Sequence, residues 1–393
     1  MRVLVITKIF PNALEPLSNP FNRQQFAALA RLDQVEVLAT IPWFPGARAF
    51  ARDSTAGRLG AVPREDRIDG LTVHHPRFLY VPKIGHALAG PLYAASLARA
   101  VLRRRGQVDV VLGSWAYPDG FAAVVLARLI GVPAVIKLHG TDMNLVAHMA
   151  GPRAGLRWAL PRASRVVAVS RPLAEAAVAL GVPRERIDVV ENGVDRELFH
   201  PRPRAQARAE LGQATGDRCV LYVGRLEPRK GVLDLIAAVE RLGRADLKLV
   251  LLGDGPLRDA CEAAARRLSG RLLVAGARPL PEVALWMAAA DAVALPSHAE
   301  GMPNVVLEAL SCGRRVVGTR VGGIPDLIDG PQLGELVAPR DVAALAAALA
   351  RAVDTPYDAE AVAAAGGRSG WNESAARLHE VLLRATGGLR RVA

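Results

Sequence analysis

The segment SHAEGMPNVVLEALSCG, Ser297–Gly313, is the most informative stretch of this 393-residue chain. It follows a short apolar run, Ala292–Leu295, and passes through glycine and proline before a helical pattern opens at about Asn304. A buried strand followed by a loop and a helix is the repeating unit of a parallel sheet. Free amides at a helix start attract anions, helped by the helix dipole. The segment therefore predicts an anion site beyond the carboxyl end of a strand.

Two glutamates in this segment are candidate ligand contacts. Glu300 lies in the loop, and Glu308 falls on the second turn of the predicted helix. A carboxylate at that second turn could accept hydrogen bonds from the vicinal hydroxyls of a ribose. Two glutamates at this spacing are also common as solvated helix charges. The apolar residues on both sides of Glu308 favour a ligand, because an unpaired charge among them is costly.

The alternation of apolar runs and helical patterns extends through the chain in both directions. Before the middle of the chain it predicts strands at Val3–Thr7, Val35–Ala39, Leu71–His74, Asp109–Gly113, Ala134–Leu138, Arg165–Val169 and Ile187–Val190. After the middle it predicts strands at Val220–Val223, Leu247–Leu252, Leu272–Ala275, Ala292–Leu295 and Arg315–Gly318. This pattern predicts an α/β protein with two doubly wound, Rossmann-like halves. Ligands of such sheets bind beyond the carboxyl ends of the strands, so we expect the halves to face each other across a cleft.

A domain linker interrupts the alternation at Glu191–Gln206, ENGVDRELFHPRPRAQ, which contains two prolines and little apolar sequence. We therefore expect an N-terminal domain over residues 1–195 and a second domain over residues 196–370. A glycine-rich break then precedes a predicted helix, Trp371–Thr386, in the remaining segment 371–393.

The segment VGRLEPRKG, Val223–Gly231, is a second candidate site. Arg225 and Lys230 bracket a short turn between a predicted strand and the helix Val232–Leu242. Helix starts favour acidic residues, so two cations there are better explained by an anionic ligand such as a diphosphate. The turn Gly253–Pro256 after the next strand fits a close approach of backbone to a ligand, although it is a weak signal alone.

A third candidate, LHGTDMN, Leu138–Asn144, ends a buried strand in the first half. His139 would project beyond that strand, and Asp142 is placed to cap or orient the turn. A lone histidine at a strand end is often structural. On the residues alone, a structural role and a functional role both remain open for His139.

The net charge of +12 admits two interpretations. Nearly all the positive charge is arginine, because lysine occurs only at positions 8, 83, 137, 230 and 248. That bias fits a GC-rich genome, and it also fits anionic partners such as nucleotide phosphates, an anionic membrane surface or a lipid-pyrophosphate acceptor. Nucleic acid is not expected as a partner, since the chain contains no recognition module and its arginines are not interleaved with aromatics.

A cytoplasmic location is expected, with peripheral association on the inner face of the membrane as an open alternative. No apolar run approaches the ~18 residues of a membrane span. The first residues predict a buried strand rather than a signal peptide, and the three scattered cysteines fit free thiols. The stretch Phe78–Arg105 combines aromatics with Arg103–Arg105, which suits either an anionic surface or simply a helix C-terminus.

Together the three segments and the ENGVD motif resemble glycosyltransferase family 4 of the GT-B fold, over nearly the whole chain and in the same order. The resemblance implies a metal-independent hexosyl transfer from a nucleotide-diphosphate sugar to a glycan or a lipid-linked acceptor in polysaccharide biosynthesis. It implies retention of the anomeric configuration, with the leaving phosphate acting as base, and no cofactor. It also implies that the helix at Trp371 crosses back onto the first domain. The sequence agrees in containing no Asp-x-Asp metal motif.

The resemblance also implies residue roles at the matching positions. Arg225 and Lys230 would bind the donor diphosphate, and Glu308 would hold the ribose. Glu300 and His139 would be the catalytic residues: Glu300 would bind the sugar hydroxyls, and His139 would contact the sugar near its 6-position, close to the reacting carbon. Sugar and phosphate would also meet the backbone amides of Gly301, Met302, Asn304 and Val305.

The loop after the first strand departs from the family pattern. Many relatives carry two glycines there, whereas this chain has Asn19-Pro20. Asn22, Arg23 and Gln24 could supply phosphate or acceptor contacts instead. The alternative is that Asn19 or Asn22 simply caps the following helix.

Two other functions remain open. A nucleotide-sugar epimerase shares the fold but would leave the family segments unexplained. A non-catalytic nucleotide-sugar sensor would not need all five of the candidate site side chains, which are His139, Arg225, Lys230, Glu300 and Glu308. The donor base, the donor sugar and the acceptor are not determined by the sequence.

Overall fold

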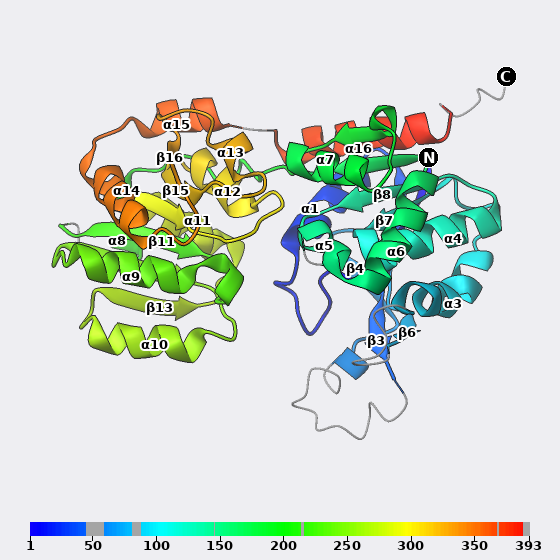
Figure 1. The fold of residues 1–393 in the computed structure, drawn as a ribbon, viewed down its shortest axis with the longest axis horizontal. Coiled ribbons are helices and arrows are strands. Elements are labelled where there is room, and N and C mark those ends of the chain that lie inside the picture. Colours follow the sequence, from blue (N-terminus) through cyan, green and yellow to red (C-terminus); the bar gives the residue numbers. More distant parts are fainter. Residues whose placement is uncertain (45–58, 81–87, 145, 214–215, 368, 388–393) are drawn as a thin grey trace. The chain divides into compact units, whose positions relative to one another are not determined.

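The chain folds into two compact α/β units. The computed structural model describes residues 1–44, 59–80, 88–144, 146–213, 216–367 and 369–387 (Figure 1). Unit 1 comprises Met1–Asn192 and Trp371–Ala393, and unit 2 comprises Gly193–Gly370. The division after Asn192 falls inside the segment that the sequence marks as a linker.

Unit 1 is built on an eight-stranded sheet in the order β10-β9-β8-β7-β1-β2-β5-β4. The central strands are almost completely buried, as expected for a sheet covered by helices on both faces. The strands, in chain order, are β1 (Arg2–Thr7), β2 (Gln34–Ala39), β4 (Glu65–Ile68), β5 (Leu71–His74), β7 (Val110–Ser114), β8 (Ala134–Leu138), β9 (Arg165–Ala168) and β10 (Ile187–Val189). The helices are α1 (Pro20–Leu29), α3 (Ala89–Leu102), α4 (Phe121–Ile130), α5 (Thr141–Asn144), α6 (Ala150–Ala159), α7 (Arg171–Ala179) and α16 (Trp371–Ala385).

The edge of this sheet differs from the all-parallel expectation. β4 pairs antiparallel with β5, whereas the other paired strands of the sheet run parallel. Its sequence, Glu-Asp-Arg-Ile, has no apolar run to detect, because an edge strand needs to bury little and is commonly charged. A separate parallel pair, β3 (Ile41–Trp43) and β6 (Arg77–Leu79), is equally short and was not predicted.

The last described helix, α16, belongs to unit 1 because its apolar face completes that core. Trp371, Leu378 and Leu382 join the same buried cluster as Phe26 and Leu29 of α1. A buried polar chain supports the contact: the Gln25 amide donates to Ser374 Oγ at 2.9 Å, and Ser374 Oγ donates to the carbonyl of Glu191 at 2.7 Å.

Unit 2 is a six-stranded parallel sheet in the order β13-β12-β11-β14-β15-β16. Renumbered from β11, this is the 3-2-1-4-5-6 order of a dinucleotide-binding fold. Its strands are β11 (Arg218–Val223), β12 (Leu247–Leu252), β13 (Leu272–Gly276), β14 (Ala292–Leu295), β15 (Arg315–Thr319) and β16 (Gly334–Val337). Its helices are α8 (Arg204–Glu210), α9 (Val232–Leu242), α10 (Arg258–Arg267), α11 (Leu280–Ala289), α12 (Asn304–Ser311), α13 (Ile324–Leu327), α14 (Val342–Asp354) and α15 (Ala359–Gly366).

The stretch proposed for a membrane surface is partly used inside unit 1. The buried face of α3 includes Tyr93, Leu97 and Val101, and Arg104 forms an ion pair with Glu36. Residues 81–87, which include Pro82 and Lys83, lie outside the described part of the chain. None of the helices described is both long and apolar enough to cross a membrane.

Candidate active site

The candidate donor site lies where the strand order of unit 2 reverses. β11 pairs with β14 although β12 and β13 intervene in the sequence. The connections leave in opposite directions from these two strands, which opens a crevice beyond their carboxyl ends. The loop after β11 carries Arg225 and Lys230, and the loop after β14 carries Ser297 and Glu300. Strand order therefore brings two of the sequence motifs together.

An ion pair joins the two loops. Lys230 Nζ lies 2.6 Å from Glu300 Oε1, and their side chains are 17% and 7% exposed. Ser297 Oγ donates a second hydrogen bond of 2.6 Å to the same oxygen. Burial strengthens such a pair and makes the loss of either partner costly. The cation and the carboxylate are therefore held in fixed positions at the switch point.

Glycines allow these loops to approach. Gly231 has φ +66°, and a Cβ atom there would lie only 2.0 Å from the carbonyl oxygen of Pro296. Gly253 has φ +146°, and a Cβ atom there would lie 1.8 Å from the carbonyl oxygen of Gly224. Only glycine fits both the backbone conformation and the space. The turn at Gly253–Pro256 thus packs against the loop that begins at Gly224.

Arg225 is the more accessible cation of the first loop. Its side chain is 68% exposed, and its ion pair with Glu227 is long, at 3.4 Å. Tyr222 Oη donates a 2.7 Å hydrogen bond to the Arg225 carbonyl, which fixes the backbone but leaves the guanidinium free to turn.

Glu308 lies on α12, the helix that follows the β14 loop. The side chain is half-buried between apolar neighbours, and in the described part of the chain its carboxylate makes no hydrogen bond or ion pair. Burial raises the pKa of Glu308 to about 7. Asn304 and Val305 form the first turn of α12, whose N-cap is Pro303 and whose first turn carries no acidic residue. Gly301 and Met302 are buried in the preceding loop.

His139 lies in unit 1, just beyond the carboxyl end of β8. Its Nε2 is 2.9 Å from Ser114 Oγ, and its ring stacks near Trp115 and Phe21 at centroid distances of 6.0 and 5.3 Å. Burial, and then the charge of Lys137, lower the pKa of His139 well below its usual value, so the imidazole is neutral at pH 7. The Asp142 carboxylate accepts hydrogen bonds from the His139 and Gly140 amides, which fixes the turn.

The side chains suggested for the first loop have different environments. Asn22 is buried, donates to the Ile9 carbonyl at 2.8 Å and accepts from Ser114 Oγ at 3.2 Å. Arg23 forms a forked ion pair with Asp69, and Gln24 is half-buried. Asn19 occupies the N-cap position of α1 without a side-chain capping bond. The Asn22 amide is thus engaged inside unit 1.

Unit 1 contains further polar residues that the sequence motifs did not indicate. Lys8 lies 5.4 Å from the centre of the Trp115 ring, and Trp115 has φ +139°, a strained conformation for a residue with a side chain. Burial raises the pKa of Asp119 to about 7 and lowers the pKa of Lys137 to about 7. Lys137 donates to the Gln25 side chain. For Trp115 and Asp119, the available signal was the run Trp115–Gly120 directly after a buried strand.

Among the residues that the structure describes, no group of three or more histidine, cysteine or acidic side chains is arranged to hold a metal ion.

Two family models match the chain, one in each half. Residues 27–198 match glycosyltransferase family 4, and residues 217–355 match glycosyl transferases group 1. TuaC of Bacillus subtilis (strain 168), provisionally named as a teichuronic acid biosynthesis glycosyltransferase, is 30% identical over 354 residues, which are 89% of each chain. A D-inositol 3-phosphate glycosyltransferase of Pseudarthrobacter chlorophenolicus is 33% identical over 352 residues, 83% of each chain.

Solved structures also resemble the fold of this chain. The structure of Anabaena HepE in complex with UDP aligns with a TM-score of 0.73 at 21% identity, covering 98% of this chain and all of that one. A sucrose-phosphate synthase from Thermosynechococcus elongatus gives the same TM-score and identity, covering 99% of this chain and 98% of that one. The chain therefore belongs to the family 4 glycosyltransferases and has their GT-B fold of two Rossmann-like units.

Proposed function

We propose that this glycosyltransferase moves a hexosyl-type sugar from a nucleotide-diphosphate donor to a glycan or lipid-pyrophosphate-linked acceptor, with retention of configuration. The observation that carries the donor assignment is the Lys230–Glu300 pair at the switch point of unit 2, held at 2.6 Å. A diphosphate matches the cation, and the hydroxyls of the attached sugar match the carboxylate. One donor molecule thus satisfies both side chains.

The pair also has a chemical role in the proposed reaction. As the bond between the anomeric carbon and the diphosphate breaks, negative charge grows on the leaving phosphate. Lys230, the exposed Arg225 and the amides of Asn304 and Val305 would stabilise that charge. The acceptor hydroxyl attacks from the same face, and its proton passes to the leaving phosphate. In this scheme, Glu300 positions the sugar hydroxyls and the protein supplies no covalent nucleophile.

His139 is proposed to contact the donor sugar as a neutral imidazole. Its lowered pKa leaves a ring that can donate or accept a hydrogen bond without adding charge beside the reacting carbon. Asn22, Arg23 and Gln24 remain candidates for acceptor or phosphate contacts. Of these, Arg23 would first have to leave Asp69.

The relatives support a role in polysaccharide or glycoconjugate biosynthesis. TuaC is named for teichuronic acid biosynthesis, and another relative is named a D-inositol 3-phosphate glycosyltransferase. HepE was solved with UDP, which supports a nucleotide-sugar donor. We further propose that the transfer needs no metal, because protein cations and amides supply the positive charge. Release of free nucleoside diphosphate from a nucleotide sugar tests the function, since an epimerase or a sensor releases little or none.

Replacing Glu308 by glutamine should weaken donor binding by about 1.5–3 kcal/mol, the worth of a hydrogen bond to a charged group. The pKa of about 7 adds a pH dependence. Below pH 7 the free carboxyl is mostly protonated, and the ionised form accepts the ribose hydroxyls better. Affinity for a nucleotide sugar should therefore be about tenfold lower at pH 6 than at pH 8, following the ionised fraction. Calorimetric titration measures both effects.

The matched control is a donor that lacks the ribose 2′-hydroxyl. With this 2′-deoxyribose donor, Glu308→Gln should cost less, because one partner of the carboxylate is already missing. The glutamine variant should also show no pH step near 7 with either donor. Equal losses for the two donors would show that Glu308 has only a structural role.

Reversible binding to anionic membranes is proposed for the surface that bears Arg103 and Arg105. Both side chains are exposed, whereas the intervening Arg104 is paired with Glu36. Each arginine near an anionic surface contributes about 1 kcal/mol. Replacing Arg103 and Arg105 by serine should therefore reduce sedimentation with anionic vesicles at low salt by about tenfold or more.

The control variant replaces Arg241 and Arg266, two exposed arginines of unit 2, and should bind vesicles like the wild type. High salt should abolish binding, because screening acts within about 10 Å at 0.1 M. If the protein shows no preference for anionic over neutral vesicles, its net positive charge reflects only a compositional bias, and a soluble acceptor is favoured.

A further inference from the structure

A cavity of about 200 Å³ lies at the amino end of the unit 2 sheet, away from the candidate donor site. Its lining includes Arg204, Arg218, Asp291, Asp354 and Tyr357. Arg218 is the first residue of β11, and Asp291 immediately precedes β14. In parallel strands these positions lie at the edge opposite the carboxyl ends. The cavity is thus separated from Lys230 and Glu300 by the length of the strands.

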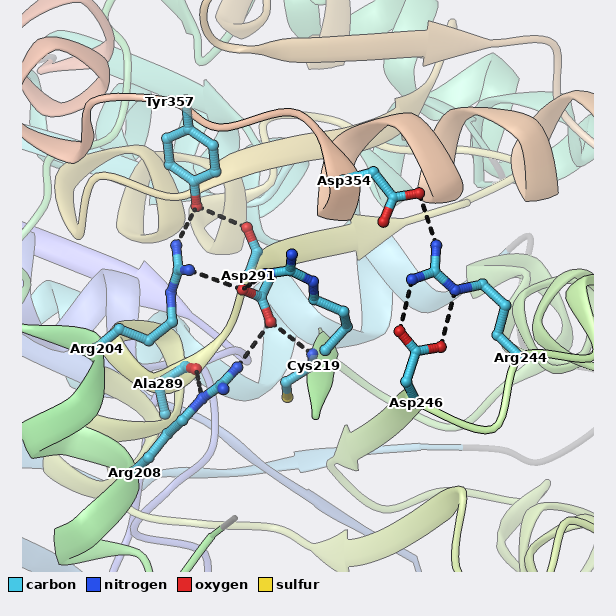
Figure 2. Close-up of polar contacts among 10 residues, drawn as sticks. Arg204, Arg208, Cys219, Arg244, Asp246, Ala289, Asp291, Asp354 and Tyr357 are labelled. Carbon is cyan, nitrogen blue, oxygen red and sulfur yellow. Dashed lines mark hydrogen bonds and ion pairs between the residues drawn. The ribbon is translucent and has the colours of Figure 1, made fainter. Parts of the chain in front are cut away.

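Asp291 is already satisfied by the protein, as Figure 2 shows. Its Oδ2 accepts 2.7 Å hydrogen bonds from the Cys219 amide and from Arg208, and its Oδ1 accepts one of 2.7 Å from Arg204. The side chain is only 3% exposed. This carboxylate therefore has no need of the charge of Arg218.

Asp354 is neutralised in a similar way. Arg244 donates to it at 2.7 Å and also forms a fork with Asp246 at 3.0 and 2.7 Å (Figure 2). The charged groups around the cavity leave one net positive charge, because four arginines (204, 208, 218 and 244) face three aspartates (246, 291 and 354). The Arg315 guanidinium, 6.0 Å from the Tyr357 ring, adds a second.

Donors remain unused at this cavity. Arg204 donates Nη1 to Asp291 at 2.7 Å and Nη2 to Tyr357 Oη at a long 3.4 Å, and its Nε is buried without a hydrogen-bond partner. Arg218 is 44% exposed and lies 3.8 Å from Asp291, beyond hydrogen-bonding distance. No other hydrogen bond of its guanidinium occurs among the described residues. The guanidinium of Arg218 thus lines the cavity with its donors available to an acceptor that enters there.

We propose that this cavity is a second anion site of the enzyme, which binds a phosphate group through Arg204 and Arg218. Arginine forks match phosphate oxygens, which can accept several N–H groups at once. The volume equals that of about seven waters at ~30 Å³ each, enough for one phosphate group with part of its hydration. Free inorganic phosphate and the phosphate of a small sugar phosphate share this chemistry. The site does not depend on the proposed donor chemistry.

The test is calorimetric titration of the full chain with inorganic phosphate at constant ionic strength. Since phosphate could also enter the donor site, the titration is repeated on Lys230→Ala, where saturable binding should persist. Arg218→Ser should weaken binding by about tenfold or more, and Arg218→Lys should restore part of it. Arg266→Ser, which removes an exposed arginine of α10, is the matched control and should bind phosphate like the wild type.

A parallel titration with a hexose phosphate identifies the source of the phosphate group: the tighter ligand of the two is the one the cavity selects. Thermal melting of each variant separates lost binding from lost folding, and the exposure of Arg218 predicts an unchanged melting temperature. The proposal is overturned if neither ligand binds saturably, or if binding survives Arg218→Ser and is lost in Lys230→Ala.

Discussion

Lys230→Ala is expected to lower kcat/KM for sugar transfer by a factor of about 10²–10³, the usual cost of removing one preorganised charge-stabilising group. The loss has two sources. The leaving diphosphate loses its half-buried cation, and Glu300 loses the partner that holds it at 2.6 Å. Steady-state kinetics with a nucleotide sugar that the wild-type enzyme cleaves measures the effect.

Arg229→Ala is the matched control for this prediction. Arg229 is the neighbouring residue in the same turn, and it pairs with Glu227 at 2.6 Å. Its removal deletes a similar charge from the same loop and should change kcat/KM by less than about fivefold, because the pair is partly exposed, at 32% and 16%, and ion pairs near the surface contribute about 0–1 kcal/mol. Comparable losses in the two variants would mean that the loop needs only general positive charge, and would remove the specific role of Lys230.

Gly231→Ala is expected to destabilise unit 2 by several kcal/mol and to abolish donor binding. The added Cβ would lie 2.0 Å from the Pro296 carbonyl oxygen, so the backbone of one loop must move. Gly231 also has φ +66°, which costs a non-glycine residue roughly 1–2 kcal/mol by itself. Any shift separates the loop of Lys230 from the loop of Ser297 and Glu300.

Gly243→Ala separates the cost of the positive φ from the cost of the steric clash. Gly243 ends the same helix, α9, with φ +62°, but nothing lies within 4 Å of its added Cβ. The free energy of unfolding of this variant should fall only by the cost of the positive φ, roughly 1–2 kcal/mol, and the variant should bind donor normally. Thermal melting and donor titration of both variants make the comparison. Equal behaviour of the two alanine variants would contradict the close packing of the β11 and β14 loops.

The sequence predicted the buried strands well because their signal is local. Ala134–Leu138 and Leu247–Leu252 have the predicted bounds, since a continuous apolar run needs no knowledge of its neighbours. β4 and β6 were missed because short edge strands bury few side chains and carry no such run. β16 was missed although it lies in the main sheet of unit 2, where its four residues, Gly-Glu-Leu-Val, show only a two-residue apolar run.

The site was only partly predictable. Lys230 and Glu300 could each be identified from a strand-to-helix loop, but their contact depends on β14 inserting beside β11, which is a property of strand order. The burial of Lys137 could not be predicted from the sequence, for a different reason. It sits in the apolar run Ala-Val-Ile-Lys-Leu and looks like an isolated surface lysine, whereas the structure buries it completely beside Gln25.

The most direct measurement is turnover of a panel of UDP- and GDP-sugars in the presence of EDTA, following nucleoside diphosphate and sugar together. We expect at least one donor to release nucleoside diphosphate and sugar in equal amounts, slowly onto water, with the anomeric configuration retained and with the release lost in Lys230→Ala. A nucleotide sugar that is bound but never cleaved, or that is converted to its epimer with the diphosphate bond intact, would contradict the account.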